Sequence, residues 1–305
     1  MAKIVVVGSA NTDMTVRSAK IPAPGETVIG GVFATAAGGK GANQAVAAAR
    51  AGGDVTFVAR LGADSLGDVA VAGYKEDGIN VSAIVRDAER ATGVALILVD
   101  AKGQNSISVA SGANAALSPA DVDAAADAIR AASVVVAQLE TPIETVQRAA
   151  ELAAQAGVPF ILDPAPAPAA PLPESLLKLV TIVKPNENEA SALTGIQVTD
   201  EASAFAAAEK LLAIGVKLAI VTLGEAGAVM ISQDGLRVKL DSRRVDAVDS
   251  TAAGDAWTGA FAVALAEGQT PVDAANFASR AAAISVTRAG AQPSLATRKE
   301  IDAFA

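Results

Sequence analysis

The chain has 305 residues, with 24 Lys and Arg against 33 Asp and Glu, which gives a formal net charge of −9. It contains no His and no Cys, so Ser-His-Asp hydrolase chemistry, His-based zinc sites, disulfides and thiol nucleophiles are excluded. The acidic balance argues against nucleic acid as a partner. No run approaches the roughly 18 apolar residues of a membrane span, so we expect no membrane partner and a cytoplasmic protein.

Six short apolar runs, rich in Val and Ile, recur along the chain at 4–7, 55–58, 134–136, 160–162, 181–183 and 218–221. Ala-rich stretches with a helical pattern lie between them. Continuous apolar strands alternating with helices are typical of a parallel sheet that is covered on both faces. The sequence therefore predicts an α/β fold with a doubly wound, mostly parallel central sheet.

Two predicted helices carry clear local signals. Ser118 and Pro119 provide an N-cap and a first-turn proline for a helix over 122–132. A second helix is predicted over 254–267, where large side chains recur every four residues and should form one buried stripe: Trp257, Phe261 and Leu265.

Two segments lack helical patterns and carry alternating apolar residues with turn signals. They are residues 11–37, which include Thr27–Ile29, and residues 92–112. We expect them to form a small antiparallel sheet, a lid, which has open edges that a second subunit would cover. The predicted division is a core of 1–10, 38–91 and 113–305, and a lid of 11–37 and 92–112.

The first candidate binding segments are a glycine-rich turn and a polar segment after the first strand. The turn holds Gly38, Gly39, Lys40 and Asn43 just before a helix, where backbone and ligand approach closely. Asn11 and Asp13 point to the same side of an extended chain and are suited to neighbouring sugar hydroxyls. A tight packing turn and an Asx turn remain alternatives for these two patterns.

The segment Asp249–Asp255 places small residues before the helix that carries Trp257. Successive free N–H groups at a helix start form an anion site, and Asp255 stands beside it. This arrangement suits transfer of a charged group to a hydroxyl, with Asp255 as the base. The alternative is a first-turn acid that is stabilised by the helix dipole.

Three further clusters are candidates for a nucleotide and metal site. Asn186 and Glu189 are one turn apart and fit Mg²⁺ through water, or an N-cap with its capping-box acid. Residues 222–227 follow a strand and fit a phosphate contact or an ordinary turn. Residues 288–294 form a non-helical loop whose carbonyls fit a cation, or a plain connector.

Taken in order, these segments resemble the PfkB family of carbohydrate kinases, over almost the whole chain. The specific motifs are GGKGANQA (38–45), GANAALSP (112–119), DSTAAGD (249–255) and GAQPS (290–294). The first two point to the ribokinase group within the family. The resemblance implies ATP-dependent phosphorylation of D-ribose at its 5-hydroxyl, with Mg²⁺ and K⁺ as cofactors. It also implies a homodimer through the lid.

The resemblance assigns roles residue by residue. It assigns sugar binding to Asn11, Asp13, Gly38, Gly39, Lys40, Asn43 and Glu140. It assigns the catalytic base to Asp255, and the anion site to the amides of Ala252, Ala253, Gly254 and Asp255. It assigns nucleotide and magnesium contacts to Asn186, Glu189, Thr222, Gly224, Gly227 and Gly254. It assigns the potassium site, mostly through carbonyls, to Asp249, Thr251, Ser285, Arg288, Gly290 and Ser294.

The chain departs from the family pattern at three positions. Ser250 and Trp257 stand where Thr and Phe are usual, and Ser279 stands where a larger polar group often lies near adenine. Ser279 leaves base selectivity open. Other functions remain as alternatives: a kinase of another sugar or nucleoside such as deoxyribose, a nicotinamide dehydrogenase, or a non-catalytic sugar-binding protein. The missing G-x-G-x-x-G after the first strand counts against the dehydrogenase.

Overall fold

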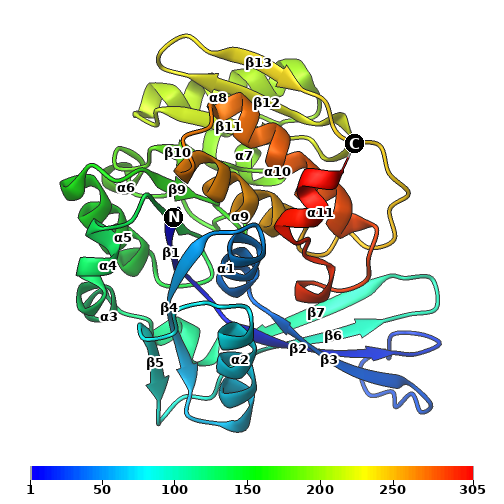
Figure 1. Cartoon of the computed structure of the whole chain (residues 1–305). Coiled ribbons are helices and arrows are strands. Elements are labelled where there is room, and N and C mark those ends of the chain that lie inside the picture. The colour runs from blue at the N-terminus through cyan, green and yellow to red at the C-terminus, as the bar shows by residue number, and fades with distance from the viewer. Residues whose placement is uncertain (1, 305) are drawn as a thin grey trace.

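A computed structural model describes residues 2–304. The predicted α/β architecture is confirmed: a nine-stranded sheet lies between two helical layers, and a four-stranded sheet projects from it (Figure 1). The terminal residues 1 and 305 of the predicted core lie outside the described residues. None of the helices over 2–304 combines the length and the hydropathy of a membrane span.

The central sheet has the spatial order β13-β12-β11-β10-β9-β8-β1-β4-β5. All its neighbouring pairs are parallel except the two at one edge, β11–β12 and β12–β13. Its strands are β1 (Lys3–Val7), β4 (Asp54–Gly62), β5 (Ile84–Asp87), β8 (Val134–Ala137), β9 (Phe160–Leu162), β10 (Ile182–Val183), β11 (Leu218–Thr222), β12 (Ala228–Ser232) and β13 (Arg237–Leu240).

The helices separate into two layers. The first layer comprises α1 (Lys40–Arg50), α2 (Ser65–Glu76), α9 (Ala253–Ala266), α10 (Pro271–Val286) and α11 (Arg298–Ala303). The second comprises α3 (Pro119–Ala124), α4 (Ala126–Arg130), α5 (Ile143–Ala156), α6 (Glu174–Leu177), α7 (Glu187–Thr194) and α8 (Glu201–Ile214). Strand β1 serves both layers, because Ile4 and Val6 face the first and Val5 and Val7 the second.

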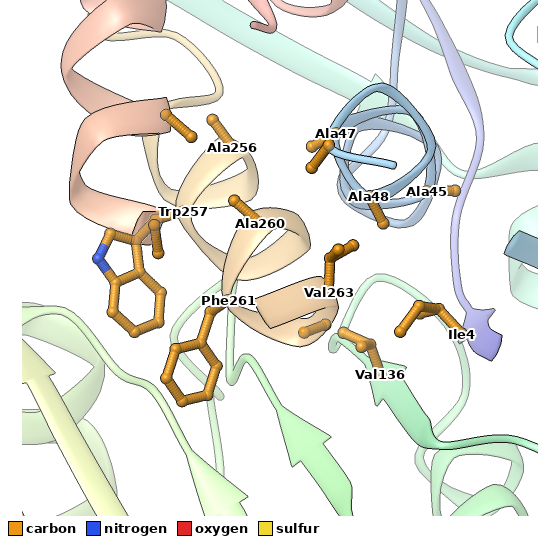
Figure 2. Close-up of a cluster of buried hydrophobic side chains, with 14 of the residues drawn as sticks. Ile4, Ala45, Ala47, Ala48, Val136, Ala256, Trp257, Ala260, Phe261 and Val263 are labelled. Atoms are coloured by element: carbon orange, nitrogen blue, oxygen red, sulfur yellow. The ribbon is translucent and has the colours of Figure 1, made fainter. Parts of the chain in front are cut away.

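Alanine fills the first layer where two of its helices pack closely. Helices α1 and α9 meet through small side chains, and Figure 2 shows Ala47 of α1 opposite Ala256 and Ala260 of α9. A Cβ at Gly259 would lie 2.6 Å from the Cβ of Ala47. The predicted stripe on α9 is buried at Trp257 and Phe261, which stack with ring centroids 4.8 Å apart. Leu265 of the same stripe is only partly buried.

The lid sheet consists of β2 (Asn11–Arg17), β3 (Val32–Gly38), β6 (Gly93–Val99) and β7 (Asn105–Ala110), in the order β3-β2-β6-β7. The expectation of a purely antiparallel sheet was wrong, because β2 and β6 pair in parallel. Both strands leave the same edge of the central region and run outward side by side. Thr27–Ile29 is not a strand, and Ile29 lies exposed in the loop before β3.

The helix predicted over 122–132 is two short helices, α3 and α4, with a break at Ala125. Its capping box is present, because Ser118 and Asp121 hydrogen-bond each other's backbone N–H groups. No side chain in the 122–132 pattern marks the break, since the residues around it are helix-forming alanines.

Candidate active site

Polar residues lie within two positions of the carboxyl ends of parallel strands. Ser9 follows β1, Gln138 follows β8, Asp163 follows β9 and Lys184 follows β10. The direction of the strand order reverses at β1, which has β4 on one side and β8 on the other. Open α/β sheets bind ligands outside the strand ends at such a reversal.

The glycine-rich turn lies tightly against the chain between β1 and β2. Gly39 has φ 89°, and a Cβ there would lie 2.7 Å from the amide nitrogen of Asn11. A Cβ at Gly41 would lie 2.5 Å from the amide nitrogen of Ser9, and one at Gly38 would lie 2.4 Å from both carboxylate oxygens of Asp13. The packing turn that remained as an alternative is therefore present, and it brings α1 against the predicted sugar-binding segment.

Glu140 joins the start of α1 to the end of β1. Its Oε2 accepts hydrogen bonds from Ser9 Oγ at 2.5 Å and from the Lys40 backbone N–H at 3.0 Å. Asp13 faces the same place: its burial and the nearby negative charge of Glu140 raise the pKa of Asp13 from 3.8 to about 6. Two carboxyl groups thus meet where the sequence predicts a sugar.

Asp255, in the first turn of α9, is buried and held from α1. Its Oδ1 accepts from Gln44 Nε2, and its Oδ2 accepts from Asn43 Nδ2, each at 2.9 Å. Burial raises the pKa of Asp255, while the charge of Lys40 opposes that rise. An acid that only complements the helix dipole does not require burial or two side-chain donors such as Asn43 and Gln44. The geometry therefore favours a chemical role for Asp255.

Lys40 lies among four carboxyl groups. Its burial disfavours the charged form, but the negative charges of Asp255, Asp163, Glu140 and Glu189 outweigh that effect and raise the pKa of Lys40. The lysine therefore stays charged between the predicted sugar end and the base. A cation at this position also reduces the repulsion among the carboxylates.

The start of α9 has an unusual backbone. Ala252 has φ 61° and is the only non-glycine with positive φ in the described chain, a conformation that is strained for alanine. The N–H of Ala253 donates to Ser250 O at 3.2 Å. Within residues 2–304, no acceptor is found for the N–H groups of Ala252, Gly254 and Asp255, so three of the four predicted amides are free at the start of the helix.

A cavity of about 300 Å³ joins four of the predicted segments. It is lined by Lys40, Asp163, Ala165, Lys184, Asn186, Glu187, Glu189, Thr222, Gly224, Ser250, Ala252, Ala253, Gly254 and Asp255. Gly227 is not among these residues. A Cβ there would lie 1.9 Å from Leu240 O, so Gly227 serves the close packing of the turn after β11 against the end of β13.

Sequence reasoning left three residues of this site without a role. Lys184 Nζ lies 3.0 Å from Asp163 Oδ2, and both side chains are buried. Gln44 Nε2 donates to the same Asp163 oxygen at 2.9 Å, whereas Asp163 Oδ1 is buried without a partner in the described chain. A charged residue directly after an apolar run, at 163 after 160–162 and at 184 after 181–183, was the available signal.

Asn186 and Glu189 form a capping box on α7. Asn186 Oδ1 accepts from the Glu189 N–H at 2.9 Å, and Glu189 Oε2 accepts from the Asn186 N–H at 2.8 Å. Both residues also line the cavity. Burial and the neighbouring Asp163 raise the pKa of Glu189. The two interpretations are therefore compatible for Glu189, because one of its carboxylate oxygens caps the helix and the other is left for a ligand. The single side-chain oxygen of Asn186 already caps the helix.

The predicted potassium residues come from segments that Asp249 links. Its Oδ1 accepts from the Thr251 N–H at 2.9 Å and its Oδ2 from the Gly290 N–H at 2.8 Å. The hydroxyls of Ser285 and Ser294 donate to carbonyls of their own turns, and Arg288 pairs with Glu300 at 2.6 Å. Residues 2–304 contain no cluster of three acidic side chains that fits a metal ion.

Ser279 lies on α10, and its hydroxyl is committed within the helical layer. It donates to Ala275 O at 2.8 Å and accepts from Trp257 Nε1 at 3.3 Å. It is not among the residues that line the cavity. The adenine contact therefore stays a prediction.

The family description "pfkB family carbohydrate kinase" matches residues 1–298. The chain belongs to this family. It is 41% identical to the ribokinase of Staphylococcus aureus over 302 residues, covering 98% of each chain. It is 43% identical to a bifunctional ribokinase/ribose-5-phosphate isomerase A of Fructilactobacillus sanfranciscensis, of whose length it spans 56%.

The fold of this PfkB-family chain matches solved ribokinases. The structure of Arabidopsis thaliana ribokinase complexed with ribose and ATP is 36% identical, with a TM-score of 0.92 and coverage of 99% of this chain and 98% of that one. The enzyme class predicted from the motifs, an ATP-dependent sugar phosphotransferase, is thereby confirmed.

Proposed function

We propose that the protein transfers the γ-phosphoryl group of ATP to the 5-hydroxyl of D-ribose and releases ADP and D-ribose 5-phosphate. The observation that carries the proposal is the placement of Asp255. Its carboxylate lies between Asn43, from the glycine-rich turn and its helix, and the cavity with the free amides of α9. Full-length similarity to ribokinases supports ribose as the sugar.

In this proposal Asp255 orients the sugar hydroxyl and takes its proton. Asn43 and Gln44 hold both carboxylate oxygens, so the base is fixed before the sugar arrives. The free amides of Gly254 and Asp255 stabilise charge on the transferring phosphoryl group. Lys40 and Lys184, which both line the cavity, balance the negative charge of the phosphates.

The oxygen groups at the cavity fit a divalent cation. Asp163 Oδ1 is buried without a partner in the described chain, and Glu189 faces the same cavity. Mg²⁺ prefers oxygen ligands and usually reaches carboxylates together with substrate phosphates. We assign these residues to hold Mg²⁺, which when bound neutralises charge on the phosphates.

For K⁺ we assign mostly backbone carbonyls of the segments that Asp249 links through its hydrogen bonds to Thr251 and Gly290. We also propose a homodimer through the lid sheet. Its β3 and β7 edges are unpaired, and it exposes Val32, Phe33, Leu96, Ile107 and Val109. Such apolar exposure beside open edges fits a second copy of the sheet.

A coupled assay of ADP release tests the proposal, with D-ribose or 2-deoxyribose and with or without K⁺. We expect ribose-dependent ADP release that K⁺ increases. The deoxy sugar lacks a hydroxyl of the diol assigned to Asp13, and an unpaired polar group costs about 1 to 3 kcal/mol, so kcat/KM should favour ribose by about tenfold or more. Ribose-independent ADP release, or a preference for deoxyribose, contradicts the assignment.

A further inference from the structure

Asn114 connects the root of the lid to the predicted sugar site. It lies in the 3₁₀ turn Gly112–Ala116 after β7, within the GANAALSP motif, and it is 2% exposed. Its side chain contacts Ala10 and Asn11, at the start of β2. None of the roles assigned so far uses this residue.

The hydrogen bonds of Asn114 determine the positions of the oxygen and the nitrogen in the side-chain amides of both Asn114 and Asn11. The Ala10 N–H donates to one side-chain atom of Asn114 at 2.9 Å, and only an oxygen can accept there. The other atom is therefore Nδ2, which donates to Ala10 O at 3.0 Å and to the Asn11 side chain at 2.7 Å. The receiving atom of Asn11 must then be Oδ1. One backbone N–H thus determines the orientation of two side-chain amides.

Asn11 consequently offers only hydrogen-bond donors to a ligand. Its Oδ1 is occupied by Asn114, while Nδ2 has no partner within residues 2–304. Asp13, two residues later on β2, lies on the same side of the strand, and its ionised carboxylate only accepts. The pair therefore suits neighbouring hydroxyls, where one oxygen accepts from Asn11 and one O–H donates to Asp13.

The two amides are packed closely against the backbone of β6. Gly93 pairs with Asn11 across the β2–β6 ladder, and a Cβ at Gly93 would lie 2.2 Å from Asn11 Oδ1 and 2.3 Å from Asn114 Nδ2. The turn itself is tied down, because Ala113 N–H donates to Ala91 O at 2.8 Å. Because residue 93 is a glycine, the side-chain amides of Asn11 and Asn114 can occupy the space that a Cβ would fill.

We propose that Asn114 is a positioning residue that sets the polarity of the sugar site, by holding the Asn11 amide with its NH₂ group toward the sugar. This inference rests on the proposed function for the identity of the sugar. It predicts that the donor from Asn11 is lost when Asn114 can no longer donate.

The decisive variant is Asn114→Asp. A carboxylate still accepts from the Ala10 N–H but cannot donate, so the Asn11 amide should rotate and present its oxygen to the sugar. We expect the Kd for ribose to rise about tenfold or more, with kcat at saturating ribose changed less than about threefold, since the base is untouched. Calorimetry and steady-state assays measure both quantities.

Binding of ribose and its monodeoxy analogues distinguishes a positioning role of Asn114 from a merely structural one. For the analogue that lacks the hydroxyl facing Asn11, Asn114→Asp should change the Kd less than about twofold. Asn11→Asp removes the same donor while Asn114 can still donate to it, and it should show the same analogue profile. Equal weakening of ribose and every analogue, or no weakening, overturns the proposal.

Asn80→Asp is the matched control, because Asn80 is an exposed asparagine whose side chain bonds only Thr56 and Ser82. It should leave the whole panel unchanged. Nucleotide affinity and the unfolding temperature show whether each variant is folded. If Asn114→Asp does not fold, the Asn11→Asp variant takes its place, and ribose affinity equal to that of wild type in this variant overturns the proposal. A wild-type enzyme that does not phosphorylate ribose counts against the proposed function, whereas unselective variants of an active enzyme count against this inference.

Discussion

The side-chain amide of Gln44 donates one hydrogen bond to Asp255 Oδ1 and another to Asp163 Oδ2, each at 2.9 Å. Its own oxygen accepts from Gln138 Nε2 at 2.6 Å, so the orientation of the amide is fixed. Gln44 is fully buried on α1, between a carboxylate of α9 and one that follows β9. The uncharged amide of Gln44 therefore donates a hydrogen bond to each of two carboxylates, Asp163 and Asp255.

Replacing Gln44 with Met should lower kcat with little effect on sugar binding. The apolar side chain leaves Asp255 Oδ1 without its donor, and hydrogen bonds to charged groups are worth about 1.5–3 kcal/mol. We expect kcat to fall about 10- to 100-fold, while the KM for ribose stays within about threefold. Gln147→Met, on α5 and away from the cavity, should leave both constants unchanged. A rise in KM with unchanged kcat contradicts the role of Gln44 in holding the base.

Asp255→Asn tests the base itself. The amide keeps the size of the side chain but cannot take a proton, so turnover should fall about 10²- to 10⁴-fold, the usual contribution of a general base. Ribose should still bind, because the other sugar-site residues remain. Stopped assays for turnover and calorimetry for ribose affinity separate the two effects; near wild-type turnover removes Asp255 from the mechanism.

The raised pKa of Asp13 predicts a pH-dependent stability in the absence of sugar. Its carboxyl titrates near 6 in the folded chain against 3.8 ordinarily, so the folded state holds its proton more tightly. The free energy of unfolding therefore decreases as pH rises between these two values and stays lower above them. Asp13→Asn removes this contribution, and its unfolding temperature relative to wild type should rise between pH 4 and pH 7. Equal differences at both pH values contradict the assignment.

Gly38→Ala should weaken the sugar site selectively. The added Cβ would lie 2.4 Å from both oxygens of Asp13, so the carboxylate has to move. We expect the KM for ribose to rise about tenfold, with nucleotide affinity unchanged. Gly73→Ala is the matched control, since nothing lies within 4 Å of a Cβ added in the middle of α2. Steady-state kinetics with ribose and with ATP varied in turn decide between these outcomes.

The central fold was predictable because each strand had its own local signature. Runs such as 160–162 coincide with β9, and the helix over 254–267 matches α9 to within a residue. The lid was harder, because its sheet depends on a parallel pairing between β2 and β6, which are separated in the sequence by β3, α1, β4, α2 and β5. No local pattern records that pairing.

The residues of the candidate site likewise differ in whether a local sequence pattern indicates them. The glycine-rich turn and Asp255 were predictable from residue types next to a helix start. Asp163 and Lys184 were not assigned, because their ion pair joins two strand ends that only the sheet order makes adjacent. Asn114 acts on a residue about a hundred positions earlier, and its motif gave no chemical reason for that contact.

The contact between α1 and α9 links the packing of the core to the proposed chemistry. A Cβ at Gly259 would lie 2.7 Å from Gln44 O as well as against Ala47, and Gln44 and Asp255 belong to the two helices that this contact joins. The separation of the helices fixes how far Asp255, the proposed base, lies from the turn assigned to the sugar. A larger side chain at Gly259 would therefore push the two helices apart and change the distance between Asp255 and the proposed sugar site. The small residues at this contact thus set the helix spacing on which the proposed phosphoryl transfer depends.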